Sequence, residues 1–133
     1  MLSVAKLFFM NNKITYRNSN QNIENNNTDS CTGFEFWSME GKNVQLTWFD
    51  VPANTNFPNH KHDSEQITYV LEGELFFKSG DTAYRLAKGD CILVPGNIDH
   101  EVWTEKSFAR AIDAWSPVNK VYTVNKISLL NKL

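Results

Sequence analysis

The sequence predicts an all-β domain, a sandwich or barrel of short strands. Three observations lead to this prediction. Runs of β-branched and aromatic residues recur from Gly33 onward, turn residues such as Pro95-Gly96-Asn97 separate the runs, and no window in the middle of the chain has helical periodicity. With 133 residues the chain has the size of one domain, and its 41% of hydrophobic residues supplies a packed core.

Residues 1–33 differ from the rest of the chain. Asparagines crowd this stretch and apolar residues become sparse after Ile14. Because such a segment buries little, we expect a loop over 18–32, preceded by a candidate edge strand at 13–17. The predicted organisation is an N-terminal segment, 1–33, followed by a barrel over 34–133.

The expected strands of the barrel are short, and turn signals separate most of them. They lie at 44–51, 67–71, 75–78, 82–86, 91–94, 102–104 and 108–115. Residues 121–124 resemble a spare strand, and 126–133 fit either a strand or a terminal helical turn. Spare strands at the two ends of a small barrel favour pairing across a homodimer, because pairing protects the edges of the sheets.

Charge and cysteine content exclude several functions. The net charge is −2 and no long run of Lys or Arg occurs, so nothing indicates binding to nucleic acid or to an anionic membrane. The apolar run at 7–10 is too short for a signal peptide or a membrane span. Cys31 and Cys91 form no CxxC pair, so we expect free thiols, a packed Cys91 and a cytoplasmic location.

The three histidines of the chain form a candidate metal site. His60 and His62 are two residues apart, so on a strand both imidazoles point to one face. A turn through Asp63-Ser64 would then bring back a second strand that offers another ligand, and His100 can close the site from across the barrel. The alternative is that these are three unrelated surface or core histidines.

The surroundings of the histidines resemble the two motifs of the cupin family. The segment from His60 to Gly73 reads His-Lys-His-x3-Gln-x6-Gly, and the segment from Gly89 to His100 reads Gly-x5-Pro-x4-His. Both occur in the family's order, and the resemblance covers about 44–115. It implies a double-stranded β-helix, the jelly-roll barrel of the cupins, and one bound divalent transition metal.

Three positions depart from the cupin pattern: Asn54 and Gln66 replace a Gly and a Glu in the first motif, and Thr104 replaces the Asn that ends the second. The predicted ligands are His60, His62, Gln66 and His100. Glu65 is the alternative to Gln66, but the spacing to Gly73 favours Gln66. Three imidazoles and an amide suit Ni, Zn, Fe, Mn or Co and leave the metal's charge uncompensated, which predicts an anionic or alkoxide-forming small-molecule partner.

A narrower resemblance concerns the last core strand. The segment from Glu65 to Glu74 is similar to that of the pectin-degradation cupins of the KdgF type, which open the ring of unsaturated uronates. Their Asp-x-Phe-Ser-Pro-x-Arg segment corresponds to residues 113–119 here. The resemblance implies that Asp113 is the acid–base carboxylate and that Trp115 and Asn119 contact the substrate, with Asn119 in place of the family's Arg.

The residues around Asp113 support a catalytic interpretation independently of the resemblance. This carboxylate lies in the otherwise mostly apolar run 109–115 and shares a strand face with Trp115. Burying a carboxylate is costly unless the group is paired or used. The alternative is an ion pair with Arg110 or Arg85 outside the barrel.

The sequence as a whole favours a metal-dependent enzyme that acts on a small sugar acid or related hydroxy-acid. Its expected chemistry is isomerisation or ring-opening by proton transfer. Two alternatives remain open, a cupin dioxygenase and a cupin that binds a small molecule without turnover, because one fold hosts many chemistries.

Overall fold

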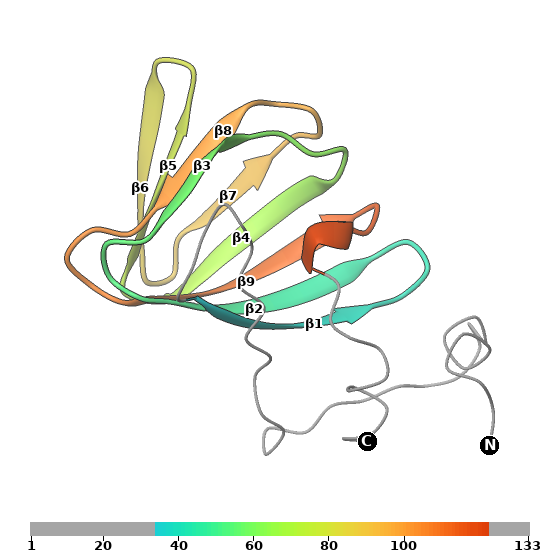
Figure 1. The fold of residues 1–133 in the computed structure, drawn as a ribbon, viewed down its shortest axis with the longest axis horizontal. Helices are drawn as coiled ribbons and strands as arrows, with labels where there is room; N and C mark the ends of the chain where they lie inside the picture. Colours follow the sequence, from blue (N-terminus) through green and yellow to red (C-terminus); the bar gives the residue numbers. More distant parts are fainter. Residues whose placement is uncertain (1–33, 123–133) are drawn as a thin grey trace.

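Two antiparallel sheets face each other in the computed structural model, which describes residues 34–122 (Figure 1). The larger sheet has the strand order β1-β2-β9-β4-β7 and the smaller has the order β3-β8-β5-β6. The predicted all-β jelly-roll architecture is confirmed. The elements are β1 (Glu35–Glu40), β2 (Gln45–Val51), β3 (Asn56–His60), β4 (Glu65–Glu72), β5 (Glu74–Ser79), β6 (Thr82–Ala87), β7 (Cys91–Val94), β8 (His100–Trp103), β9 (Ala109–Ser116) and the 3₁₀ turn η1 (Lys120–Tyr122).

The strands predicted between residues 44 and 116 all occur, most of them within two residues of the expected bounds. The structure adds β1 and β3, which the sequence did not delimit. β3 contains Pro58, and it lies at the edge of its sheet, where a missing N–H is tolerated. The expectations for residues 1–33 and 126–133, including the strand at 13–17 and the domain division, concern residues outside the described ones.

The strand expected at 121–124 is wrong over its described part, because residues 120–122 form the 3₁₀ turn η1. Asn119 explains the turn. Its side-chain Oδ1 accepts a hydrogen bond from the N–H of Val121 at 3.1 Å, and its carbonyl accepts one from the N–H of Tyr122 at 3.2 Å. A short side chain that bonds to the backbone ahead of it favours a turn over a strand.

Gly73 marks the point where the chain leaves one sheet and enters the other. β4 before it pairs with β7 and β9, whereas β5 after it pairs with β6 and β8. Gly73 has φ +71°, and a Cβ there would lie 1.9 Å from the carbonyl oxygen of Phe108. Only glycine satisfies both conditions, so the crossover depends on this residue.

The interior between the sheets is not uniformly apolar. Apolar clusters that include Phe36, Phe49 and Trp115 on one side and Val70 and Phe77 on the other fill most of it. The inner face of the five-stranded sheet also buries several polar side chains. They are Ser38, Gln45, Thr47, Gln66, Thr68 and Asp113. Because buried polar groups are costly unless they bond or function, this face marks the candidate site.

Cys91 is exposed, so the expectation that it packs in the core is wrong. The alternation along β7 explains the error: Ile92 and Val94 face inward, which turns Cys91 and Leu93 to the outer face. Among the described residues, no helix is long and apolar enough to cross a membrane.

Candidate functional site

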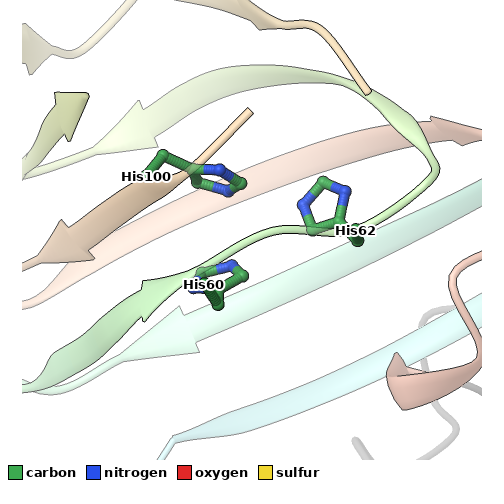
Figure 2. Close-up of side chains that lie close together, drawn as sticks. All are labelled: His60, His62 and His100. Atoms are coloured by element: carbon green, nitrogen blue, oxygen red, sulfur yellow. The ribbon is translucent and has the colours of Figure 1, made fainter. Parts of the chain in front are cut away.

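Three histidines from neighbouring segments converge at one end of the interior. His60 ends β3, His100 begins the adjacent β8 directly opposite it, and His62 follows in the connection to β4. One ring nitrogen of each lies within 4.8 Å of those of the other two. Figure 2 shows the three rings facing a common space. The three histidines are therefore placed to bind a metal ion.

The backbone around His60 and His62 is arranged differently from the prediction. His60 and His62 do not share a strand, because β3 ends at His60 and its pairing with β8 is irregular between Phe57 and His60. Asp63 and Ser64 do not close a hairpin, because β3 and β4 belong to different sheets. The segment is held instead by a hydrogen bond from the N–H of Asn97 to the carbonyl of His62 at 2.7 Å.

Gly96 and Asn97 allow the turn of the second motif to pack closely against His62 and Asp63. A Cβ at Gly96 would lie 2.5 Å from the carbonyl oxygen of Asp63, so no larger residue fits there. Asn97 has φ +61°, a conformation that asparagine tolerates better than most residues. The close approach therefore requires glycine at 96, and asparagine takes the left-handed position at 97.

Each histidine is oriented by a backbone carbonyl. Nδ1 of His60 lies 2.7 Å from the oxygen of Pro58, Nδ1 of His62 lies 2.8 Å from that of Ser64, and Nδ1 of His100 lies 2.8 Å from that of Ile98. A carbonyl only accepts, so each Nδ1 carries a proton, and in the neutral ring Nε2 is the nitrogen that can bind a metal. Such outer contacts are typical of metal-binding histidines.

The Nε2 of His100 is buried and has no hydrogen-bond partner among the described residues. Burial lowers the pKa of His100 and of His62, although hydrogen bonds to backbone carbonyls partly oppose the effect. The lower pKa favours the neutral form of both imidazoles, which is the form that binds metals. A bound cation would supply the partner that the buried lone pair lacks, so the cluster fits a transition metal.

Gln66 faces the histidines, whereas Glu65 is exposed on the outer face of β4. The Oε1 of Gln66 lies 3.1 Å from Nε2 of His62, and its Nε2 donates to Oγ1 of Thr68 at 2.8 Å. With its proton on Nδ1, His62 presents a lone pair to the amide oxygen. Two acceptors that face each other need a shared positive charge, which is the arrangement expected of two ligands of one cation.

Asp113 lies at the centre of the buried face. It is 7% exposed and is paired in register with Thr47 on β2 and Thr68 on β4. Its Oδ2 accepts a hydrogen bond from Nε2 of Gln66 at 3.4 Å, and its Oδ1 has no partner among the described residues. Burial raises the pKa of Asp113 to about 7, with a hydrogen bond from Thr68 acting in the opposite direction.

The alternative ion pairs for Asp113 do not form. Arg110 binds Asp50, with Nε to Oδ1 at 2.7 Å, and Glu72, with Nη1 to Oε1 at 3.3 Å. Arg85 pairs with Glu74. Asp113 is therefore a carboxylate inside the barrel without an ion-pair partner. Because the ion-pair alternative is removed, the functional interpretation of its burial remains.

A cavity of about 40 Å³ connects these groups. His60, Gln66, His100, Asp113 and Trp115 all line it. This volume is sufficient for a metal ion. Aromatic rings form one wall, where Trp115 stacks on Tyr122 at 5.5 Å between ring centroids and meets the ring of His62 edge to face at 5.2 Å.

The structure does not bring Asn119 into the cavity lining. Its backbone N–H donates to Oε1 of Gln45 at 2.7 Å, and its carbonyl accepts from Nε2 of Gln45 at 3.2 Å. Together with the bond to Val121, these contacts engage Asn119 in holding η1 against β2. The predicted contact between Asn119 and a substrate has no support from this arrangement.

Sequence reasoning missed three residues that shape the site: Thr68, Tyr122 and Gln45. The alternation along β4 gave a signal for Thr68, because it lies two residues after Gln66 and must face the same way. Nothing in the sequence indicated Tyr122, whose ring lines the cavity and whose carbonyl accepts a hydrogen bond from Gln45.

Comparison with known proteins gives three findings. The family profile described as "Cupin domain" matches residues 47–114. An RmlC-like cupin from Shewanella frigidimarina NCIMB 400 superposes with a TM-score of 0.72 at 20% identity, over 86% of this chain and 100% of that chain. KdgF from Halomonas sp. superposes with a TM-score of 0.62 at 20% identity, over 67% and 83%.

Among curated proteins, the acireductone dioxygenase of Tuber melanosporum (strain Mel28) is 37% identical over 76 residues. The match covers 48% of this chain and 44% of that protein. The chain thus spans less than half the length of this relative. The structural matches show the same fold.

Proposed function

The chain belongs to the cupin family, and from this premise we propose that it is a metal-dependent enzyme that moves a proton on a small hydroxy-carbonyl compound. A sugar acid or related hydroxy-acid is the proposed substrate class. The observation that carries the proposal is Asp113, an unpaired carboxylate buried in the same cavity as the histidine cluster. A carboxylate kept in such a place at the cost of its hydration suits proton transfer.

We propose His60, His62, His100 and Gln66 as the residues that hold the metal. When bound, a divalent ion of Ni, Zn, Fe, Mn or Co would supply Lewis acidity that lowers the pKa of a substrate hydroxyl. All four ligands are neutral, and among the described residues that line the cavity none is a lysine or an arginine. The attraction for an anionic substrate would therefore come from the ion's uncompensated charge.

Asp113 is proposed to exchange a proton with the substrate through Oδ1, the oxygen without a protein partner. On an enol, a proton taken from the hydroxyl and returned to the adjacent carbon of the double bond, while that double bond becomes the C=O bond, completes a tautomerisation, which needs no external oxidant or reductant. Gln66 and Thr68 orient the carboxylate through its other contacts. Trp115 and Tyr122 exclude water from one side of the cavity.

A second candidate function is that of a dioxygenase. The identity with a protein named acireductone dioxygenase favours it. Gln66 argues in the other direction, because iron sites of the facial-triad type use a carboxylate ligand where this chain has an amide. The remaining alternative is a cupin that binds a small molecule without turnover. It would use the same metal ligands, but it gives Asp113 no role.

The Asp113→Asn variant tests the proposal. Metal-loaded protein is incubated with a panel of unsaturated uronates and related hydroxy-acids, with and without oxygen, and products are identified by proton NMR. We expect turnover that does not need oxygen. Asp113→Asn should retain its metal and fold but lose turnover by about two to four powers of ten, the usual range for a general acid–base group.

Asp81→Asn, in the exposed turn between β5 and β6, is the matched control and should behave as wild type. Turnover that consumes oxygen would replace the proposal with the dioxygenase function. Full activity in Asp113→Asn would show that the carboxylate moves no proton, and metal binding without turnover on any substrate would favour the binding function.

We also propose that the chain forms a homodimer, as the spare terminal strands predict. The candidate strand at 13–17 lies outside the described residues, and the one at 121–124 is replaced by η1 over its described part.

A further inference from the structure

The wall of the cavity that Tyr122 forms differs from the other walls. Every other described residue that lines the cavity lies on a strand of one of the two sheets. Tyr122 instead lies in η1, the short 3₁₀ turn after β9, and Figure 1 shows η1, in red, outside both sheets. Among the described walls, this is therefore the one that can move without separating a pair of strands.

The size of the cavity indicates that a wall has to move. Its volume is about 40 Å³. Sites that bind small organic molecules usually measure about 300–1,000 Å³. The inference rests on the proposed function at this point, since that function supplies the occupant, a sugar acid or related hydroxy-acid. Such a molecule is larger than the cavity as it stands, so it needs room that the two sheets do not give.

Aromatic contacts favour the position of the Tyr122 ring over the interior. The ring meets Phe49 edge to face at 5.0 Å between centroids, meets Phe36 edge to face at 5.6 Å and stacks on Trp115 at 5.5 Å. Several such pairs at once stabilise the closed position of the ring. They do not fix the backbone of η1, which depends on hydrogen bonds to β2.

Gln45, the first residue of β2, supplies these hydrogen bonds and is only 2% exposed. Its Oε1 accepts a hydrogen bond from the N–H of Asn119 at 2.7 Å. Its Nε2 donates to the carbonyl oxygen of Asn119 at 3.2 Å and to that of Tyr122 at 3.4 Å. One buried amide thus contacts the residue before η1 and the residue that ends it. A few hydrogen bonds of modest strength hold such a turn in place and still allow it to open locally.

The amide of Gln45 is also linked to the ring on which Tyr122 stacks. Its Nε2 donates to Oγ of Ser38 at 2.9 Å, and that oxygen lies 3.3 Å from Oγ1 of Thr47. The hydroxyl of Thr47 in turn accepts a hydrogen bond from Nε1 of Trp115 at 3.0 Å. One buried chain of hydrogen bonds therefore holds the indole at one end and η1 at the other. Opening of η1 would uncover the face of the Trp115 ring.

We propose that η1 is a lid over the cavity, that Gln45 holds this lid closed, and that a small molecule reaches the histidine cluster when the lid opens. Gln45 is a positioning residue, because it does not line the cavity and acts through the turn that carries Tyr122. Opening costs the hydrogen bonds of one turn and the contacts of one ring, whereas every strand pair is retained. Lids of this kind open on the microsecond to millisecond timescale.

Hydrogen exchange of the full chain, followed by NMR, tests the opening. The two probes are the backbone N–H of Asn119 and the indole N–H of Trp115, and the backbone N–H groups of β4 are the reference. We expect both probes to exchange faster than β4 in the wild type, because the lid opens without the barrel. In Gln45→Leu both should exchange at least about tenfold faster, since several hydrogen bonds are lost and each one contributes up to about tenfold.

Two further variants keep this test decisive. Ser38→Ala removes one hydrogen bond of the Gln45 amide, so it should accelerate both probes by about two- to fivefold, and it gives the answer if Gln45→Leu does not fold. Thr104→Val is the matched control. Thr104 is also buried, at 3% exposed, and its hydroxyl also binds a loop, through the Pro52 carbonyl at 2.6 Å, but it follows the end of β8 opposite His100. Both probes should exchange in Thr104→Val as they do in the wild type.

Diethyl pyrocarbonate, a reagent comparable in size to a small hydroxy-acid, tests access to the cavity. It modifies neutral imidazoles, and peptide mass spectrometry follows its reaction with His100 after a chelator has removed any metal. Because His100 is 2% exposed, the reaction requires an opening. Gln45→Leu should speed it at least about tenfold, as for hydrogen exchange. Tyr122→Ala, which removes the covering ring, should also speed it, whereas Thr104→Val should not.

Two results would overturn the proposal. If both probes exchange only as slowly as β4, or equally faster in Thr104→Val, η1 opens only together with the barrel. If His100 reacts as fast in the wild type as in Tyr122→Ala, small molecules reach the cavity by another route. Neither measurement requires turnover, so failure of the lid is distinguishable from failure of the proposed function.

Discussion

At the scale of single residues, the candidate site depends on which end of the Gln66 amide faces the histidines. Thr68 decides this, because its Oγ1 accepts a hydrogen bond from the amide nitrogen at 2.8 Å. The carbonyl end is thereby turned toward His62. The amide would otherwise be free to rotate and present an N–H group, which cannot bind a metal.

Replacing Thr68 tests this orientation. We expect Thr68→Val, which keeps the shape but removes the acceptor, to weaken metal binding by about 10- to 100-fold, the usual effect of removing a contact that orients a ligand. Thr68→Ser retains the hydroxyl and should bind metal as the wild type does. The dissociation constants are measured by competition with a chromophoric chelator. Equal affinity in all three proteins would show that Thr68 does not position Gln66.

The Asp113 side chain shows what sequence reasoning can and cannot supply at this scale. A lone carboxylate in an apolar strand was visible in the sequence and predicted a buried group. Its contact with Gln66 was not visible, because it joins residues 47 positions apart and depends on the pairing of β4 with β9. Asn119 was predicted to contact the substrate because it occupies a family position. That resemblance gave no indication that the backbone N–H of Asn119 donates a hydrogen bond to Gln45.

At the scale of elements, alternation and turn residues predicted most strands, because both are local properties of the chain. Which strand pairs with which is not local. The segment from His60 to Gln66 resembles a hairpin in sequence, yet β3 and β4 enter different sheets. The candidate metal site therefore receives His60 from one sheet and Gln66 from the other. β3 continues through Pro58 with an irregular register between Phe57 and His60, and it ends at His60 without forming a hairpin with β4.

Gly73 provides a test of the crossover between the sheets. Gly73→Ala should destabilise the fold strongly, because the new Cβ meets the Phe108 carbonyl at 1.9 Å in addition to the cost of φ +71°. Gly80→Ala is the control: its φ is +58° but a Cβ there meets nothing within 4 Å. We expect a loss of about 1 kcal/mol at Gly80, the cost of the left-handed conformation alone.

The loss at Gly73 should exceed that at Gly80 by about 2 kcal/mol or more, since backbone atoms must shift to relieve the overlap. Chemical denaturation with urea measures both free energies of unfolding. Equal losses at the two positions would contradict the requirement for close packing at the crossover.

At the scale of the whole molecule, the candidate metal site exists only when the two sheets pack together. His60 and His100 come from the four-stranded sheet, whereas Gln66 and the neighbouring Asp113 come from the five-stranded sheet. The inner faces of both sheets therefore contribute to the candidate site. The sequence predicted the donor atoms through their motif, and the fold supplies their common location.

The central claim is that His60, His62, His100 and Gln66 hold one transition metal ion, and metal stoichiometry tests it most directly. Protein without a histidine tag is saturated with metal, freed of excess and analysed for its elements. We predict one ion per chain in the wild type, with much weaker retention in His100→Ala and in Gln66→Ala, since each removes a ligand. An absence of bound metal in the wild type, or one ion retained equally by His100→Ala, would contradict the claim.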